Sequence, residues 1–262
     1  MARFETYPPG TFSWVDLMAK DVARAKRFYG QLFDWTAEEQ DTGGGPPYVM
    51  FRHDGDEVAG LGQMPDEMQQ QGVPGVWSSY VTVADLDAVV GRVEKHGGKV
   101  AMPPIQVFDA GHMAVVTDRE GAALSLWRPL AHKGAAKCNE PGSFCWNELA
   151  VRDIDGAREF YKGVFGWDYT LNDDAPTTYY LICNGNQTNG GLLQMNEQWG
   201  DMPSHWSVYF AVDDVDARVA KVKELGGTVH AEPFEIPVGR LTVVQDDQGA
   251  HFYMLRIMGN EG

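Results

Sequence analysis

The chain repeats one long pattern. Residues 28–35 read FYGQLFDW and residues 160–167 read FYKGVFGW. The match extends upstream, where WVDLMAKDVARAKRFY begins at Trp14 and WNELAVRDIDGAREFY at Trp146. It also extends downstream, where GHMAVVTDREGAALSLW from Gly111 corresponds to GRLTVVQDDQGAHFYML from Gly239. Self-similarity at a nearly constant spacing indicates a duplicated domain.

The length and the segment between the copies suggest domain limits. A chain of 262 residues is long enough for two domains. Between the copies, LAHKGAAKCNEPG (Leu130–Gly142) is small, polar and without periodicity, which is typical of a linker. We expect a first domain at 1–132, a linker at 133–141 and a second domain at 142–262.

Each copy consists of two similar halves. Every half has a short alternating stretch, then an aspartate, then a helical pattern followed by strand-like segments. The aspartates suit helix N-caps because a carboxylate accepts from the free amides of the first turn; they are Asp21, Asp85, Asp153 and Asp214. The pattern predicts an α+β fold with four units of one helix and several strands each.

Composition excludes several classes of protein. The chain is 44% hydrophobic and 22% charged, as globular proteins are. Acidic residues outnumber basic ones by 37 to 21, and this field repels phosphate backbones, so we expect no nucleic-acid partner. The chain start lacks a signal-peptide core and no apolar run approaches a membrane span, so we expect a cytoplasmic protein with no membrane partner. Three cysteines without a CxxC pair argue against a disulfide framework.

Two repeated motifs carry a resemblance to a known family. They are D-x-x-x-A-x-x-F-Y-x-x-x-F-x-W, from Asp21 and Asp153, and D-x-x-G-A, from Asp118 and Asp246. In these the chain resembles a tandem two-domain member of the vicinal oxygen chelate superfamily, which includes glyoxalases, bleomycin-resistance proteins and extradiol dioxygenases. The resemblance implies that each domain has two βαβββ modules forming a curved, cup-like mixed sheet with helices on its outer face. One chain then supplies both domains, and we expect a monomer or weak homodimer.

Strand alternation predicts which side chains line the cups. In the first strand, Val15 and Leu17 point one way, under the helices, while Trp14 and Asp16 point into the cup. The same argument gives a candidate ligand-binding set for each cup. The first cup receives Trp14, Ser78, Tyr80, Ser125 and Trp127, and the second Trp146, Ser207, Tyr209 and Tyr253. Gln63 and Gln194 are also expected to face the cups.

The resemblance also implies where a metal would bind. The superfamily's ligands are His, Glu or Gln on the opening and closing strands. Here those positions hold Trp14, Ser78, Ser125, Trp146, Ser207 and Tyr253. Indole cannot ligate a metal, and neutral Ser and Tyr are poor ligands. We therefore expect no metal and no other cofactor, with a divalent metal on non-standard ligands as the alternative.

Two carboxyls and a histidine are the candidate catalytic groups. Asp16 and Glu148 occupy matching places two residues after a tryptophan, where partial desolvation would raise their pKa and suit them to acid–base work. Alternatively, each only accepts a hydrogen bond from a tyrosine or a backbone amide. His251 lies on the same face and could partner Glu148 or Tyr253, or could be a structural hydrogen bonder.

Aromatic walls with a few hydroxyls suit a flat organic molecule. Trp14 or Trp146 would be its stacking wall, unless these indoles only plug the core. Three hypotheses follow. The first is a protein that binds or sequesters a small, aromatic ligand, and the second is a metal-independent enzyme using Asp16 or Glu148. The third is a metal-dependent glyoxalase or dioxygenase with non-standard ligands.

Overall fold

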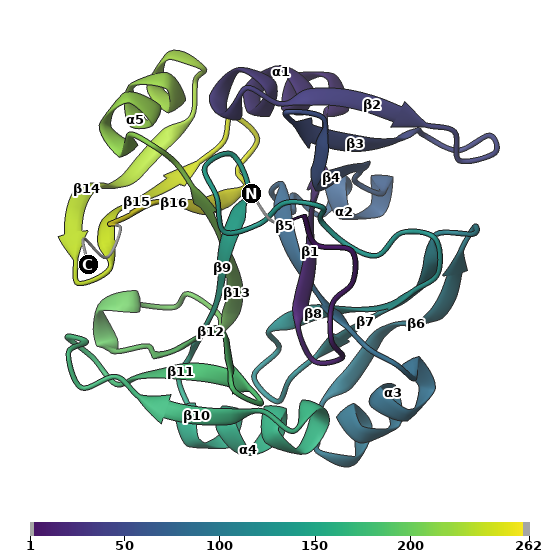
Figure 1. The fold of residues 1–262 in the computed structure, drawn as a ribbon, viewed down its shortest axis with the longest axis vertical. Coiled ribbons are helices and arrows are strands. Elements are labelled where there is room, and N and C mark those ends of the chain that lie inside the picture. The colour runs from purple at the N-terminus through teal and green to yellow at the C-terminus, as the bar shows by residue number, and fades with distance from the viewer. Residues whose placement is uncertain (1–2, 259–262) are drawn as a thin grey trace.

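Two eight-stranded mixed sheets form the protein in the computed structural model, which describes residues 3–258 (Figure 1). The strand order is β2-β3-β4-β1-β5-β8-β7-β6 in one sheet and β10-β11-β12-β9-β13-β16-β15-β14 in the other. Corresponding strands occupy the same positions in the two orders, so the two copies of the sequence fold with the same topology. The α+β fold with duplicated βαβββ modules is confirmed.

The first sheet contains two modules, which open with β1 and β5. Its elements are β1 (Phe12–Ala19), α1 (Val22–Phe33), β2 (Thr36–Gln40), β3 (Tyr48–His53), β4 (Asp56–Gln63), the short α2 (Asp66–Gln70), β5 (Val76–Thr82), α3 (Leu86–Lys95), β6 (Lys99–Val107), β7 (Gly111–Thr117) and β8 (Ala123–Pro129).

The second sheet repeats this order. Its elements are β9 (Phe144–Val151), α4 (Ile154–Phe165), β10 (Asp168–Leu171), β11 (Tyr179–Asn184), β12 (Gln187–Gln194), the 3-10 turn η1 (Glu197–Trp199), β13 (His205–Ala211), α5 (Val215–Glu224), β14 (Thr228–Ile236), β15 (Gly239–Gln245) and β16 (His251–Ile257). Among the described residues, no helix is long and apolar enough to cross a membrane.

Local sequence signals define the four main helices as expected. Asp21 caps α1 by accepting from the backbone N–H of Arg24, and Asp85, Asp153 and Asp214 cap α3, α4 and α5 in the same way. Beyond α3, Gly97 has a φ of 90°, a left-handed conformation that costs glycine little.

The four main helices lie at two opposite ends of the interface between the sheets, α1 beside α5 and α3 beside α4, while β5 and β13 of the two sheets contact each other directly (Figure 1). As a result, each main hydrophobic core draws residues from both domains. One core joins α1 to the second domain, where the ring centroids of Phe33 and Phe210 lie 5.1 Å apart. The other joins α3 and α4, with Val93 and Phe160 among its buried members. Neither domain completes either of these two cores alone.

The segment at 133–141 is packed against the first domain. Ala135 N–H donates to the Ser13 carbonyl and Ala136 N–H to the Glu57 carbonyl, both at 2.8 Å, and Ala135 is fully buried. The expected domain limits stay a prediction, although the two sheets lie on either side of this segment.

Candidate functional site in the two cups

Strand register brings the first cup's side chains together. On β1 and β5, Trp14 lies opposite Tyr80. Asp16 accepts a hydrogen bond from Tyr80 Oη at 2.8 Å and another from Tyr48 Oη at 3.3 Å. Trp14 Nε1 donates in turn to Tyr48 Oη at 3.1 Å. The carboxyl therefore sits at the centre of a network built from three strands.

The second cup repeats this network with Glu148 in place of Asp16. Tyr209 Oη donates to Glu148 Oε1 at 2.7 Å, and Tyr179 also hydrogen-bonds this carboxyl. Trp146 Nε1 donates to Tyr179 Oη at 3.0 Å. The rings of Tyr209 and Tyr253 are stacked, with centroids 4.2 Å apart. A buried carboxyl is thus surrounded by four aromatic side chains.

Sequence reasoning missed two tyrosines of the site. Tyr48 on β3 reaches Asp16, and Tyr179 on β11 reaches Glu148. A glycine makes room for each hydroxyl. A Cβ at Gly60 would lie 1.7 Å from Tyr48 Oη, and one at Gly191 would lie 1.9 Å from Tyr179 Oη. The matching glycines in AGLGQM and GGLLQM were the available signal.

Burial changes the acid–base behaviour of both carboxyls. Desolvation raises the pKa of Asp16 to about 6, although its hydrogen bonds from Tyr80 and Tyr48 lower it. Burial also raises the pKa of Glu148, opposed by the hydrogen bonds from Tyr209 and Tyr179. Each carboxyl therefore holds its proton more strongly than an exposed acid does.

A side chain from the segment that follows β8 covers Trp14 in the first cup. The His132 ring meets Trp14 edge-on, with centroids 4.5 Å apart. Its Nδ1 lies 3.4 Å from Glu57 Oε2, and Trp127 Nε1 donates to its backbone carbonyl at 3.0 Å. Trp14 is left only 4% exposed. Trp14 therefore fills the core of this cup.

The tryptophan of the second cup is more accessible than that of the first. Trp146, Tyr179 and Tyr253 are only partly buried, whereas Glu148 beneath them is 7% exposed. Two substitutions between the copies also change the wall, because Tyr253 stands where the first cup has Ser125 and Leu255 where it has Trp127. The second cup thus combines reachable aromatic faces with a sequestered acid.

The serines predicted for the cups lie beside the tyrosines. Ser125 hydrogen-bonds Tyr80, and Ser207 hydrogen-bonds Tyr253. Ser78 lies directly across from Asp16 in the register of β1 and β5. Ser125 therefore supports the tyrosine that donates to Asp16.

The placement expected for Gln63 and Gln194 is wrong. Alternation puts Gln63 on the face of Leu61, and Gln194 on that of Leu192, both of which are buried under the helices. The Gln63 amide donates to the Lys20 carbonyl at 2.8 Å. Gln194 likewise donates to the Arg152 carbonyl. Each glutamine therefore hydrogen-bonds the backbone that directly follows the neighbouring strand, β1 or β9.

The side chain of His251 meets His230, and neither Glu148 nor Tyr253, as its hydrogen-bond partner. Its Nε2 lies 3.1 Å from His230 Nε2, and the Gly249 backbone hydrogen-bonds its ring. The carboxyl of Glu148 is already engaged by Tyr209 and Tyr179, as described above. His230 lies on β14, the edge strand of this sheet.

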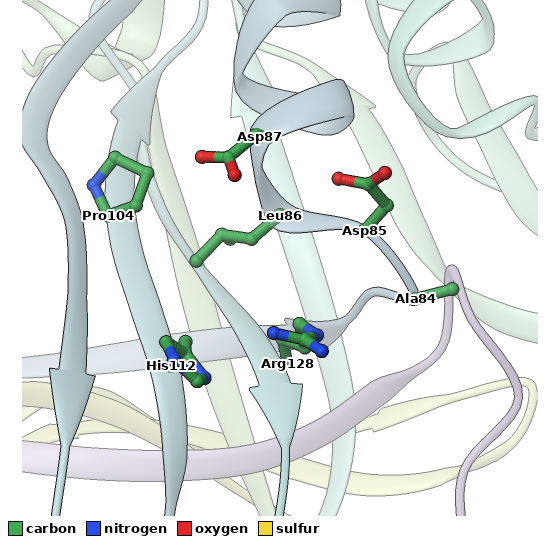
Figure 2. Close-up of a pocket in the computed structure, with 7 residues that line it drawn as sticks. All are labelled: Ala84, Asp85, Leu86, Asp87, Pro104, His112 and Arg128. Atoms are coloured by element: carbon green, nitrogen blue, oxygen red, sulfur yellow. The ribbon is translucent and has the colours of Figure 1, made fainter.

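A separate cavity of about 250 Å³ lies on the helix-covered face of the first sheet (Figure 2). Asp85 and Asp87 at the start of α3 lie near His112 and Arg128 there. In the second copy the residue corresponding to His112 is Arg240, which reaches Asp216 at 2.8 Å. The cavity therefore lies at the position where the first copy has His112 in place of the longer arginine.

The side chains at the superfamily's expected metal positions do not fit a metal ion. Trp146, Ser207 and Tyr253 present one indole and two neutral hydroxyls. Throughout residues 3–258, no three His, Cys, Asp or Glu side chains gather in a group that could hold a metal ion. The absence of a cofactor remains a prediction.

The repeated βαβββ modules and their two cups define the fold of the vicinal oxygen chelate class. A family model described as Glyoxalase/Bleomycin resistance protein/Dioxygenase superfamily matches residues 11–126 and 144–253. The chain belongs to this superfamily.

Two named relatives match almost the whole chain. The "Putative glyoxylase CFP32" of Mycobacterium tuberculosis is 41% identical over 259 residues, covering 98% of each chain. The "Anthracycline biosynthesis protein DnrV" of Streptomyces peucetius is 35% identical over 270 residues, covering 98% of this chain and 96% of that protein.

Among solved structures, the Mn(II)-bound glyoxalase from Novosphingobium aromaticivorans is similar with a TM-score of 0.61 and 18% identity. The match covers 97% of this chain and 83% of that chain. This likeness concerns the fold alone.

Proposed function

We propose that the protein binds a flat, largely apolar small molecule in the second cup. Trp146 provides the stacking wall, and Glu148 faces the polar edge of the ligand. The observation that carries this proposal is the buried Glu148 carboxyl, hydrogen-bonded to Tyr209 at 2.7 Å, beneath aromatic rings that remain partly exposed.

The physical chemistry of this cup favours such a ligand. Aromatic rings offer large apolar faces for stacking, while hydroxyl and carboxyl groups fix the orientation of a bound molecule. Because burial raises the pKa of Glu148, its carboxyl keeps a proton for a carbonyl oxygen of the ligand more readily than an exposed glutamate does. The relatives named for anthracycline biosynthesis support the ligand class, since anthracyclines are flat polycyclic aromatic compounds.

The same carboxyl could support a reaction. A buried carboxyl with a raised pKa suits general acid–base chemistry better than an exposed glutamate does, because it can exchange a proton with an oxygen of a bound molecule. The proposed activity is therefore ligand binding, with metal-independent acid–base chemistry at Glu148 where the ligand carries a carbonyl group. No step in this proposal uses a metal.

The proposal requires one chain only. The second cup is built from β9, β11, β13 and β16, so no residue of another subunit is needed. A monomer or weak homodimer in the cytoplasm is consistent with it, with no nucleic-acid or membrane partner.

Equilibrium dialysis of the untagged protein against 1,8-dihydroxyanthraquinone tests the binding proposal. We expect one bound molecule per chain, with little change after treatment with a chelator. Trp146→Ala should weaken binding at least about fivefold, because an aromatic stack contributes about 1 kcal/mol beyond buried area. The absence of binding, or unchanged binding by Trp146→Ala, would contradict the proposal.

A further inference from the structure

Three side chains with available lone pairs meet on the concave face of the second sheet. They are His230 on β14, Gln245 on β15 and His251 on β16. His230 Nε2 lies 3.1 Å from His251 Nε2 and 3.3 Å from Gln245 Oε1. Gln245 and His251 are also directly paired in the register of β15 and β16.

The backbone of Gly249 fixes how two of these side chains point. Gln245 Nε2 donates to the Gly249 carbonyl at 3.1 Å, which turns Oε1 towards His230. The Gly249 backbone also hydrogen-bonds the His251 ring. Because Nε2 of His251 faces His230, that bond falls to the other ring nitrogen. A bond of this kind leaves Nε2 with its lone pair, which is how metal-binding histidines are held.

Hydrogen bonds among these three side chains do not use all of their lone pairs. With Nε2 of His251 unprotonated, a single N–H on His230 faces two acceptors, the His251 nitrogen and the Gln245 oxygen. A cation would satisfy all three lone pairs. Metal–imidazole bonds of about 2.0–2.1 Å place two ligating nitrogens about 2.9–3.3 Å apart in octahedral or tetrahedral geometry. The separation of 3.1 Å falls within this range.

We propose that His230 and His251, with Gln245 Oε1 as a third donor, form a binding site for a divalent transition metal such as Zn²⁺, Ni²⁺ or Cu²⁺. Imidazole ligands suit these ions. Both histidines are exposed, so water can complete the coordination shell. The site is distinct from the superfamily's expected positions at Ser207 and Tyr253, and it does not depend on ligand binding in the cup.

The first domain provides an internal contrast. Its register pairs Thr117 with Ala123 where the second domain pairs Gln245 with His251. The residue that corresponds to His230 is Ala101. The first copy therefore offers no lone-pair donor cluster at this place, and one site per chain is expected.

Calorimetric titration of the untagged, chelator-treated full chain with ZnCl₂ tests the proposal. We expect one ion per chain, and at least tenfold weaker binding by His251→Gln and by His230→Gln. Gln245→Glu should tighten binding, because a carboxylate is a better ligand than an amide. His205→Gln is the matched control, since His205 lies on the same face with its Nδ1 bound to the Pro203 carbonyl at 2.8 Å.

Circular dichroism of each variant establishes that it is folded. The proposal is overturned if the wild-type protein takes up no zinc, or if His251→Gln binds as tightly as wild type. It is also overturned if His205→Gln weakens binding as much as His251→Gln does.

Discussion

Tyr29 of the first domain donates its phenolic hydroxyl to Asp246 Oδ2 of the second domain across 3.0 Å. The copy repeats this bond in the opposite direction, because Tyr161 donates to Asp118 Oδ2, also at 3.0 Å. The tyrosines belong to the F-Y motif and the aspartates to the D-x-x-G-A motif. Two motifs far apart in the sequence are therefore partners across the interface between domains.

Removing either hydroxyl should destabilise the whole protein. Tyr29→Phe leaves Asp246 Oδ2 and the Trp77 indole N–H without their partner, since Trp77 Nε1 donates to Tyr29 at 2.9 Å. Unpaired buried polar groups cost about 1–3 kcal/mol. Urea unfolding should show this loss for Tyr29→Phe and again for Tyr161→Phe.

Tyr180→Phe is the matched control. Its hydroxyl accepts from Arg158 at 3.2 Å near the surface, so its loss should change stability by less than about 0.5 kcal/mol. Equal stability of Tyr29→Phe and Tyr180→Phe would refute the role assigned to the cross-domain bonds.

Separated domains should not fold stably. A fragment of residues 1–132 would expose Phe28 and Phe33, which are at most 2% exposed in the whole chain. Loss of the shared core removes the main favourable term in folding. We expect no cooperative unfolding transition in circular dichroism for this fragment, and its recovery on mixing with residues 133–262. A well-folded, monomeric fragment would show that the shared core is not required.

The two cup tryptophans should differ in their effect on stability. Trp14 is closed in by His132, so Trp14→Ala should lower the free energy of unfolding by about 3–5 kcal/mol. Trp146 is partly exposed, so Trp146→Ala should cost clearly less. Urea unfolding of both variants measures this, and equal losses would mean that the second cup is also a closed core.

Asp16 should make stability depend on pH in an unusual direction. Burial raises its pKa to about 6 from the ordinary 3.8, so the folded state holds a proton that the unfolded chain has released. Between these values the folded state binds more protons, and the free energy of unfolding therefore falls as pH rises. Asp16→Asn cannot titrate and should lose less stability over this window. Urea unfolding between about pH 4 and pH 6 compares the two proteins, and parallel profiles would count against a raised pKa.

Local signals made most of the fold predictable from the sequence. The N-cap of Asp21 depends on a few neighbouring residues, and the cup face of Trp14 depends only on strand alternation. Because the sequence repeats, the same two predictions held for the second copy. The cores shared between the two domains were harder to predict, because a repeated sequence does not say which helices and strands of the two copies pack against each other.

The site was harder to predict for the same reason. Tyr48 reaches Asp16 from β3, and strand order alone brings these residues together. His132 lies in a segment that resembled a linker, yet it covers Trp14. Gln63 shares the face of Leu61, and its bond to the Lys20 carbonyl depends on the pairing of β4 with β1.

Matched carboxyl variants test the central claim, that the second cup binds a flat ligand through Glu148. Glu148→Gln and Asp16→Asn make the same change at corresponding places, one beside the partly exposed Trp146 and one beside Trp14, which His132 covers. The measurement is the dissociation constant for 1,8-dihydroxyanthraquinone by isothermal titration calorimetry. The account predicts at least tenfold weaker binding by Glu148→Gln and unchanged binding by Asp16→Asn; equal effects of the two variants, or no effect of Glu148→Gln, would contradict it.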